Sequence, residues 1–271
     1  MGIYLKRYCQ DKPPIGSTVN FGHPFARGLV GCWLMNEGGG KGIYDLANKN
    51  NGIFQATTSW KSGIKGIATN YNGTNDWVKV SNSKILSGLT QFSIISSIQT
   101  TAGNVAGGRS IYCERASSGG NDIVKLDSLE NNVGFIVYRN DGGTLTRSFG
   151  TTVINNGMYH LLCGVRDSAG CKFYTDGKLE DSDARVGNDN LTNAVDSRIG
   201  GDPQGVTNDY SGLIFFIYLY NRAIIHSEIR SLYEAPYQFI QTPRRIFYSL
   251  STGAVSVPNP RRSMTGVNRI K

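Results

Sequence analysis

The sequence predicts an all-β fold in which two antiparallel sheets pack face to face as a sandwich or jelly roll, with one short helix near the C-terminus. Three observations support this prediction. The 271 residues include 34 glycines, which favour a chain with many turns. Short apolar runs recur between clusters of Gly, Asn and Asp. Helical periodicity is nearly absent, and there is no internal repeat of fixed period.

Ten segments have the composition and length of strands. In chain order they are Cys32–Leu34, Trp77–Val80, Phe92–Ile98, Ile111–Arg115, Ile123–Leu126, Val133–Tyr138, His160–Val165, Lys172–Thr175, Arg198–Gly200 and Leu213–Tyr220. Two connections are strong hairpin signals, Asn140-Asp141-Gly142 and Thr175-Asp176-Gly177. Glycine tolerates the positive φ that such tight turns require.

The last of these strands is apolar at every position, which is unusual for an antiparallel strand with one wet face. Strict alternation predicts one face made of Leu213, Phe215, Ile217 and Leu219, and another made of Ile214, Phe216, Tyr218 and Tyr220. We therefore expect both faces to be covered. The segment that follows predicts a short helix with Ser227 as its N-cap.

The net charge of +8 is carried by the two ends of the chain. Residues 1–29 carry a net charge of +3 and residues 240–271 carry +6, so the centre is close to neutral. We predict a basic N-terminal arm at 1–29, a sandwich at 30–239 and a basic, proline-containing C-terminal arm at 240–271. A nucleic-acid-binding domain concentrates charge on a folded face, so nucleic acid is not the expected partner.

The sequence also indicates the cell compartment and the redox state of the protein. No apolar run is long enough to span a membrane, and the first residues lack the apolar centre of a signal peptide. The five cysteines form no Cys-x-x-Cys pair. We expect a reduced protein that is made in the cytoplasm and is not secreted.

Several ordered pieces resemble a laminin G-like module of the concanavalin A-like jelly-roll superfamily over about residues 30–235. They are Gly31–Gly40, the turn Asp45–Gly52, Tyr71–Val78, Gly157–Asp167, the hairpin Phe173–Lys178, and the closing strand and helix Gly212–Tyr233. Many relatives carry acidic residues in the closing strand, where this chain has Phe215 and Phe216. The resemblance therefore implies the fold, while these two rings replace oxygen ligands for calcium with an apolar surface.

Single modules with such arms also resemble virion proteins of tailed bacteriophages. This resemblance implies a non-catalytic virion structural protein, one that decorates or cements the capsid or associates with the head. It also implies a location in the virion after synthesis in the host cytoplasm. Capsid or other virion proteins would be the partners. We expect the arms to bind acidic partner surfaces through Lys6, Arg7, Arg244, Arg245, Arg261 and Arg262. Homo-oligomerisation through Phe215 and Phe216 is a further expectation.

Two alternatives remain open. The first is a carbohydrate-binding adhesin on a tail or fibre, in which Asp45, Asn75, Asp76 and Asp202 hold calcium as the one possible cofactor. The competing interpretation is that these residues only stabilise turns. The second alternative is a diverged glycan-cleaving enzyme. Its nearest acidic cluster, Glu180-Asp181-Ser182-Asp183, follows a hairpin and is expected to be a solvated loop.

Overall fold

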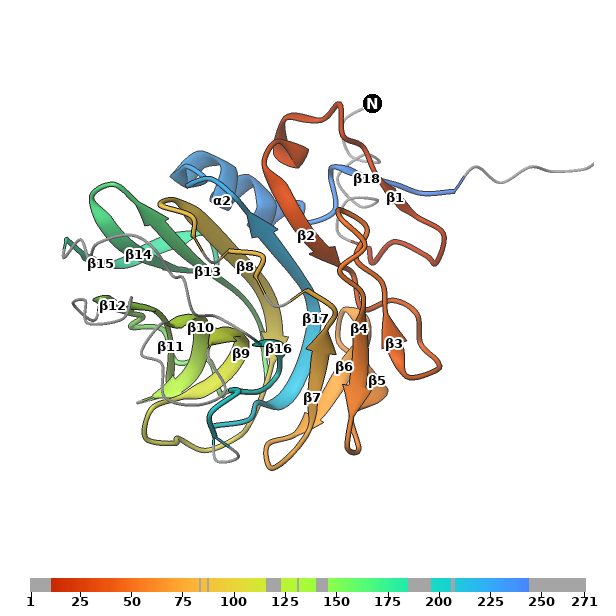
Figure 1. The fold of residues 1–271 in the computed structure, drawn as a ribbon, viewed down its shortest axis with the longest axis horizontal. Helices are drawn as coiled ribbons and strands as arrows, with labels where there is room; N and C mark the ends of the chain where they lie inside the picture. The colour runs from red at the N-terminus through yellow and green to blue at the C-terminus, as the bar shows by residue number, and fades with distance from the viewer. Residues whose placement is uncertain are drawn as a thin grey trace, which may run out of the picture.

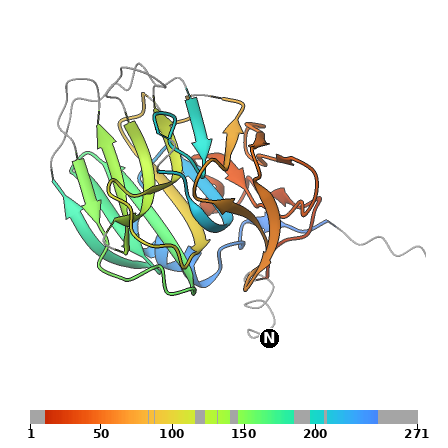
Figure 2. The same cartoon turned by 90° about the horizontal axis from the view of Figure 1, so that it is seen from below.

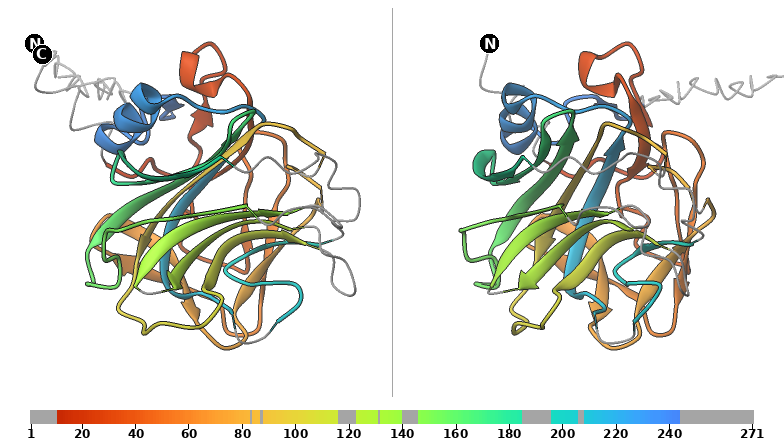
Figure 3. Two further views of the ribbon diagram at one scale, coloured as in Figure 1. Left: turned by 90° about the vertical axis from the view of Figure 1, so that its left-hand side faces the viewer. Right: turned by 60° about the vertical axis from the view of Figure 1, so that its left-hand side comes forward.

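A computed structural model describes residues 11–82, 84–86, 88–115, 123–130, 132–139, 146–184, 196–205 and 208–243. These residues form two eight-stranded antiparallel sheets, a two-stranded ribbon and one α-helix. The sheets pack face to face, and the helix lies outside one of them (Figure 1, Figure 3). The predicted two-sheet sandwich is confirmed. Neither helix in the described part of the chain has the length and apolar composition needed to cross a bilayer.

The helix-covered sheet contains, in spatial order, β15 (Lys178–Asp183), β14 (Gly170–Thr175), β13 (Tyr159–Asp167), β8 (Phe92–Gln99), β17 (Ser211–Tyr220), β6 (Gly66–Asn72) and β5 (Ser59–Gly63), and β2 (Leu29–Trp33) pairs with β17. The opposite sheet contains β12 (Thr146–Phe149), β11 (Val133–Arg139), β10 (Ile123–Glu130), β9 (Arg109–Arg115), β16 (Asp196–Ile199), β7 (Trp77–Val80), β4 (Gly52–Gln55) and β3 (Gly42–Ile43). Figure 2 shows the yellow-green strands β9 to β11 of this sheet side by side.

A first apolar cluster fills the space between the sheets. It includes Trp33, Phe92, Tyr112, Ile214 and Ile217, and all of these side chains are fully buried. Inward-facing residues of both sheets interdigitate there, as expected of a sandwich core.

A second apolar cluster covers the outer face of the helix-covered sheet. Ile229 and Leu232 of α2 (His226–Glu234) and Phe239, which follows it, pack on Tyr218 and Tyr220 of β17. The rings of Tyr218 and Phe239 meet edge to face with centroids 5.1 Å apart. Both faces of β17 are therefore covered, as predicted, and the cover comes from the chain itself.

A β-bulge in β17 changes which face its side chains occupy. Ile214 pairs with Ile98 of β8 and Phe216 pairs with Ser97, so Phe215 is an extra residue. As a result Phe215 and Phe216 both lie in the helix-side cluster, and the predicted strict alternation is wrong. Both rings are fully buried inside the chain. The prediction that they form an interface with another subunit is therefore also wrong.

The start of α2 differs from the prediction. The N-cap position is Ile225, and Ser227 lies inside the helix. The carboxylate of Glu228 accepts the Ile225 N–H at 3.0 Å and two hydrogen bonds at 2.8 Å from the guanidinium of Arg222. A side chain three residues into the helix therefore caps this end in place of the predicted serine.

The described parts of both arms are packed on the sandwich. β1 (Thr18–Val19) pairs with β18 (Ile240–Gln241), as Figure 1 shows, and a 3-10 helix, η1 (Pro24–Ala26), follows β1. Val19, Ala26 and Phe239 belong to the helix-side cluster. Residues 11–29 are thus part of the folded unit, because their apolar side chains have a surface to cover.

Lys12 fixes this N-terminal segment to the sheet. β17 pairs with β6 up to Ile214 and with β2 from Ile217, so the carbonyl of Phe215 has no strand partner on that side. The ammonium of Lys12 donates to this carbonyl at 2.7 Å and also to the carbonyl of Ile67. Burial lowers the pKa of Lys12 to about 7, although the Glu37 carboxylate opposes the shift.

Candidate functional site

The predicted calcium ligand Asp45 is a turn organiser. Its Oδ1 accepts the backbone N–H groups of Cys32 at 2.7 Å and Ala47 at 2.9 Å. Its Oδ2 accepts those of Asn48 at 3.2 Å and Asn50 at 3.0 Å. Four backbone donors therefore occupy both oxygens, which is the turn role that the competing interpretation proposed.

The other three predicted calcium ligands are similarly engaged. Asp76 accepts from the backbone and hydroxyl of Thr57 and from the N–H of Asn72, while Asn75 accepts from the Asn72 side chain. Asp202 forms ion pairs with two cations. No group of three or more His, Cys, Asp or Glu side chains in the described ranges is arranged to hold a metal ion. The structure thus gives these residues roles other than the predicted one.

The predicted solvated loop at 180–183 is in fact part of an edge strand, β15, whose carboxylates bind backbone donors of the other sheet. Asp183 accepts the N–H of Arg147 at 3.1 Å, and Asp181 accepts that of Phe149 at 3.0 Å. These donors belong to β12, the edge strand of the opposite sheet. The acidic cluster therefore closes one side of the sandwich and protects an exposed edge.

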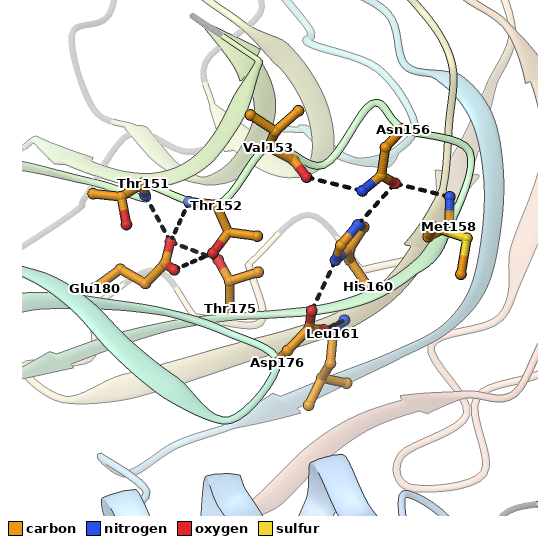
Figure 4. Close-up of polar contacts among 10 residues, drawn as sticks. All are labelled: Thr151, Thr152, Val153, Asn156, Met158, His160, Leu161, Thr175, Asp176 and Glu180. Atoms are coloured by element: carbon orange, nitrogen blue, oxygen red, sulfur yellow. Dashed lines mark hydrogen bonds and ion pairs between the residues drawn. The ribbon is translucent and has the colours of Figure 1, made fainter.

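Glu180 continues this closure beyond the end of β12. Its Oε2 accepts the backbone N–H groups of Thr151 at 2.7 Å and Thr152 at 3.0 Å, and the hydroxyl of Thr175 at 3.0 Å (Figure 4). The hydroxyl of Thr152 donates to the other oxygen. Burial acts to raise the pKa of Glu180, but these hydrogen bonds outweigh it and hold the pKa below its usual range.

His160 links the same hairpin to the loop before β13. Its Nδ1 lies 2.8 Å from Oδ2 of Asp176 and its Nε2 lies 3.1 Å from Oδ1 of Asn156, as Figure 4 shows. Both ring nitrogens are therefore engaged within the chain, so His160 has no nitrogen left to act on a substrate. Asp176 and Gly177 both have positive φ, which confirms the predicted turn. The predicted hairpin at Asn140–Gly142 lies outside the described residues.

An ionic network lies on the outer side of the opposite sheet. Lys125 on β10 lies 2.6 Å from Asp127 and 3.4 Å from Asp202, and Arg115 on β9 lies 3.2 Å from Asp202. Burial acts to lower the pKa of Lys125, but the neighbouring carboxylates raise it to about 12. Burial also raises the pKa of Asp127 to about 6, against the attraction of Lys125. Each charge of this network has an oppositely charged neighbour, although Nε of Arg115 and Oδ1 of Asp127 have no hydrogen-bond partner among the described residues.

An open groove on the other side of the molecule has the character of a binding site. It has a volume of about 410 Å³ and lies between the β5–β6 hairpin, the start of β13 and the end of α2. Its walls include three tyrosines from these elements and three further side chains: Tyr159, Tyr233, Tyr237, Ile64, Lys65 and Met158. We call this the tyrosine groove. Ile64, Met158 and Tyr233 are largely exposed, which is uncommon for large apolar side chains packed side by side.

The two phenylalanines of the β17 bulge support the tyrosine groove from behind. The ring of Phe215 lies 5.6 Å from that of Tyr159, and the ring of Phe216 lies 5.5 Å from that of Tyr237, edge to face. These contacts restrict the two tyrosine rings, so the walls are held in place before any ligand arrives. Phe215 and Phe216, which the sequence suggested as interface residues, thus lie one layer below the surface of the tyrosine groove and support its walls.

The tyrosine groove also contains a charged group that can bind a ligand. The hydroxyl of Tyr237 is not such a group, because it is buried behind the surface of the groove and has no hydrogen-bond partner among the described residues. The ammonium of Lys65 lies 5.5 Å from the centroid of the Tyr159 ring.

Sequence reasoning missed the tyrosine groove because its walls come from three distant segments. Tyr233 and Tyr237 are four residues apart at the end of the helix, which was the one available signal. Nothing in the sequence placed Lys65 or Tyr159 beside them. The predicted arm residues Lys6, Arg7, Arg244, Arg245, Arg261 and Arg262 lie outside the described residues.

Solved structures with the same fold include domains of several larger proteins. The binding domain of Paraclostridial Mosquitocidal Protein 1 is 17% identical, with a TM-score of 0.56, and the match covers 76% of this chain and 52% of that one. This chain therefore spans about half the length of that domain. Domain 4 of an extracellular arabinanase from Geobacillus stearothermophilus, solved with arabinotriose, is 17% identical, with a TM-score of 0.53 and coverage of 75% and 97%.

A third similar structure is a carbohydrate-binding module of a Ruminococcus gnavus sialidase bound to sialyllactose. It is 16% identical, with a TM-score of 0.52, and the match covers 64% of this chain and 97% of that one. No curated protein matches the sequence. A laminin G family profile does match, over residues 72–230, which is more than half of the chain. The chain therefore belongs to this laminin G family of the concanavalin A-like lectin/glucanases superfamily.

Proposed function

We propose that this protein is a non-catalytic carbohydrate-binding module that holds a sugar in the tyrosine groove. The observation that carries the proposal is the set of three tyrosine rings around an open hollow, with the exposed amine of Lys65 beside them. Carbon–hydrogen faces of a sugar stack on aromatic rings, and its hydroxyls pair with polar groups at the rim. This is the alternative that the sequence left open, moved to a site that it did not predict.

Two further points support a binding role. Similar domains of this fold have been solved with arabinotriose and with sialyllactose. Hydrolysis by a retaining or inverting mechanism needs two carboxylates that face a cleft. The nearest acidic cluster, at 180–183, instead binds backbone donors of β12 and the loop after it.

The test is binding of an oligosaccharide panel to wild-type protein and to Tyr233→Ala. Tyr233 is 43% exposed, so its removal leaves the core intact. Tyr44→Ala is the matched control, because Tyr44 is 60% exposed and does not line the groove. We expect wild type and Tyr44→Ala to bind at least one oligosaccharide, and Tyr233→Ala to bind it at least about tenfold more weakly. Equal binding by all three proteins would exclude the tyrosine groove as the site.

The virion role stays a prediction of the sequence. It rests on the basic residues of the two arms, which lie outside the described residues. Removal of residues 244–271 tests it, since this deletion leaves β18 in place. Loss of incorporation into particles would support the role, and unchanged incorporation would contradict it.

A further inference from the structure

Lys65 is the charged side chain of the tyrosine groove that the chain leaves without a counter-ion. It lies in the turn between β5 and β6 and is exposed. No carboxylate of the described residues lies within ion-pair distance of its ammonium. An exposed ammonium on this kind of turn is normally a mobile charge, but here the ring of Tyr159 attracts it from 5.5 Å. The charge is therefore held against one wall of the groove.

Two other charges in or beside the groove are already engaged. Glu234, which also lines the groove, lies 3.7 Å from the guanidinium of Arg230, one helical turn earlier in α2. The ammonium of Lys12 lies in the adjoining hollow with Asp11, and it donates to the carbonyls of Ile67 and Phe215. Asp11 is exposed but lines the adjoining hollow and not the groove. Of the charged groups that line the groove, Lys65 alone has no ion-pair partner among the described residues.

We propose that the tyrosine groove selects acidic sugars, whose carboxylate binds the ammonium of Lys65. This inference rests on the proposed function, because it specifies the ligand of the same site. The sugar ring stacks on the exposed ring of Tyr233, and the carboxylate forms a charge-assisted hydrogen bond with Lys65. Phe215 holds the ring of Tyr159 in place, and this ring attracts the ammonium of Lys65. The site therefore loses little conformational freedom when the carboxylate binds.

The test compares acidic sugars with their neutral methyl esters. The probes are oligogalacturonate and sialyllactose, each with its own methyl ester, titrated at low and at high salt. Acetate at the same concentration controls for a carboxylate without a sugar. We expect at least one acidic member to bind about tenfold more tightly than its neutral partner, with the difference reduced at high salt. Acetate is expected not to compete at the same concentration.

The matched variants are Lys65→Gln and Lys61→Gln, since both lysines are exposed and Lys61 lies on β5 outside the groove. Lys65→Gln should bind acidic and neutral partners equally, and Lys61→Gln should keep the preference. An unchanged preference in Lys65→Gln, or equal binding of both partners by wild type, overturns the inference and leaves the proposed function standing. Failure of every sugar to bind wild type overturns both. Thermal unfolding of each variant confirms that it is folded.

Discussion

Glu180 joins the edges of the two sheets, and its replacement by glutamine tests how much this closure stabilises the fold. In Glu180→Gln the amide oxygen can still accept the N–H groups of Thr151 and Thr152, and the NH₂ group then faces the Thr152 hydroxyl, but the acceptor loses its charge. Hydrogen bonds to a charged acceptor are stronger than those to a neutral one by about 1 kcal/mol each, so two weakened bonds give a destabilisation of about 2 kcal/mol. For a chain of this size we expect the melting temperature to fall by about 4 to 8 °C.

The effect should depend on pH in a defined direction. The folded pKa of Glu180 lies below the unfolded value of 4.5, so the carboxylate stabilises the fold above that pH. Its contribution is lost as the pH falls through the lower folded pKa. The difference between wild type and Glu180→Gln should therefore be full at pH 7 and shrink below pH 4.5.

Urea unfolding of both proteins at pH 7 and at pH 3.5 measures this difference. Glu234→Gln is the matched control, because Glu234 is 52% exposed in its ion pair with Arg230 and should change stability by less than about 0.5 kcal/mol. Equal stability of wild type and Glu180→Gln at pH 7 would refute the closure of the sandwich by this side chain.

Three other substitutions follow from the structure. Burial raises the pKa of Asp209 to about 7, so the folded state holds its proton above the unfolded pKa of 3.8 and stability falls as pH rises toward 7. Between pH 5 and 8.5, the free energy of unfolding of wild type, measured in urea, should fall by about 2 to 3 kcal/mol relative to that of Asp209→Asn. The same pH dependence of stability in both proteins would argue against this. Lys12→Met leaves the carbonyls of Ile67 and Phe215 without this donor and should lower the free energy of unfolding by about 1 to 2 kcal/mol at pH 7.5 in the same assay. Unchanged stability would show that Lys12 does not anchor the N-terminal segment. A Cβ at Gly200, where φ is +81°, would lie 2.3 Å from Tyr71, so Gly200→Ala should cost more than about 3 kcal/mol. Gly39→Ala, with nothing within 4 Å, is its control and should be near neutral in thermal unfolding.

The sequence predicted the sandwich because strand composition and turn chemistry are local. The Asp176-Gly177 turn, for example, has the positive φ values that its residues favour. The bulge at Phe215 was not predictable, since an extra residue in a uniformly apolar strand leaves no mark in the pattern. The cover of β17 was predicted, but its source was not. Tyr237 and Phe239 lie beyond the helix in a segment whose residues alone do not show where it packs.

The candidate site was less predictable than the fold. Asp45 and Asp76 have the composition of metal ligands, but the backbone donors that occupy them become visible only in three dimensions. Lys65 and Tyr233 come from distant hairpin and helix ends, so only the folded chain brings them into one groove. Residues that bind ligands often lie on such connecting segments, which sequence patterns describe least well.

Methyl NMR of the methionines tests the central claim most directly, because one of the four methionines lines the tyrosine groove. Met158 is 59% exposed there, while Met35 is fully buried between the sheets. During titration with an oligosaccharide that binds, the Met158 methyl signal should shift with the same Kd as binding, and the Met35 signal should stay in place. Binding that leaves the Met158 signal unchanged would contradict the assignment of the tyrosine groove as the sugar site.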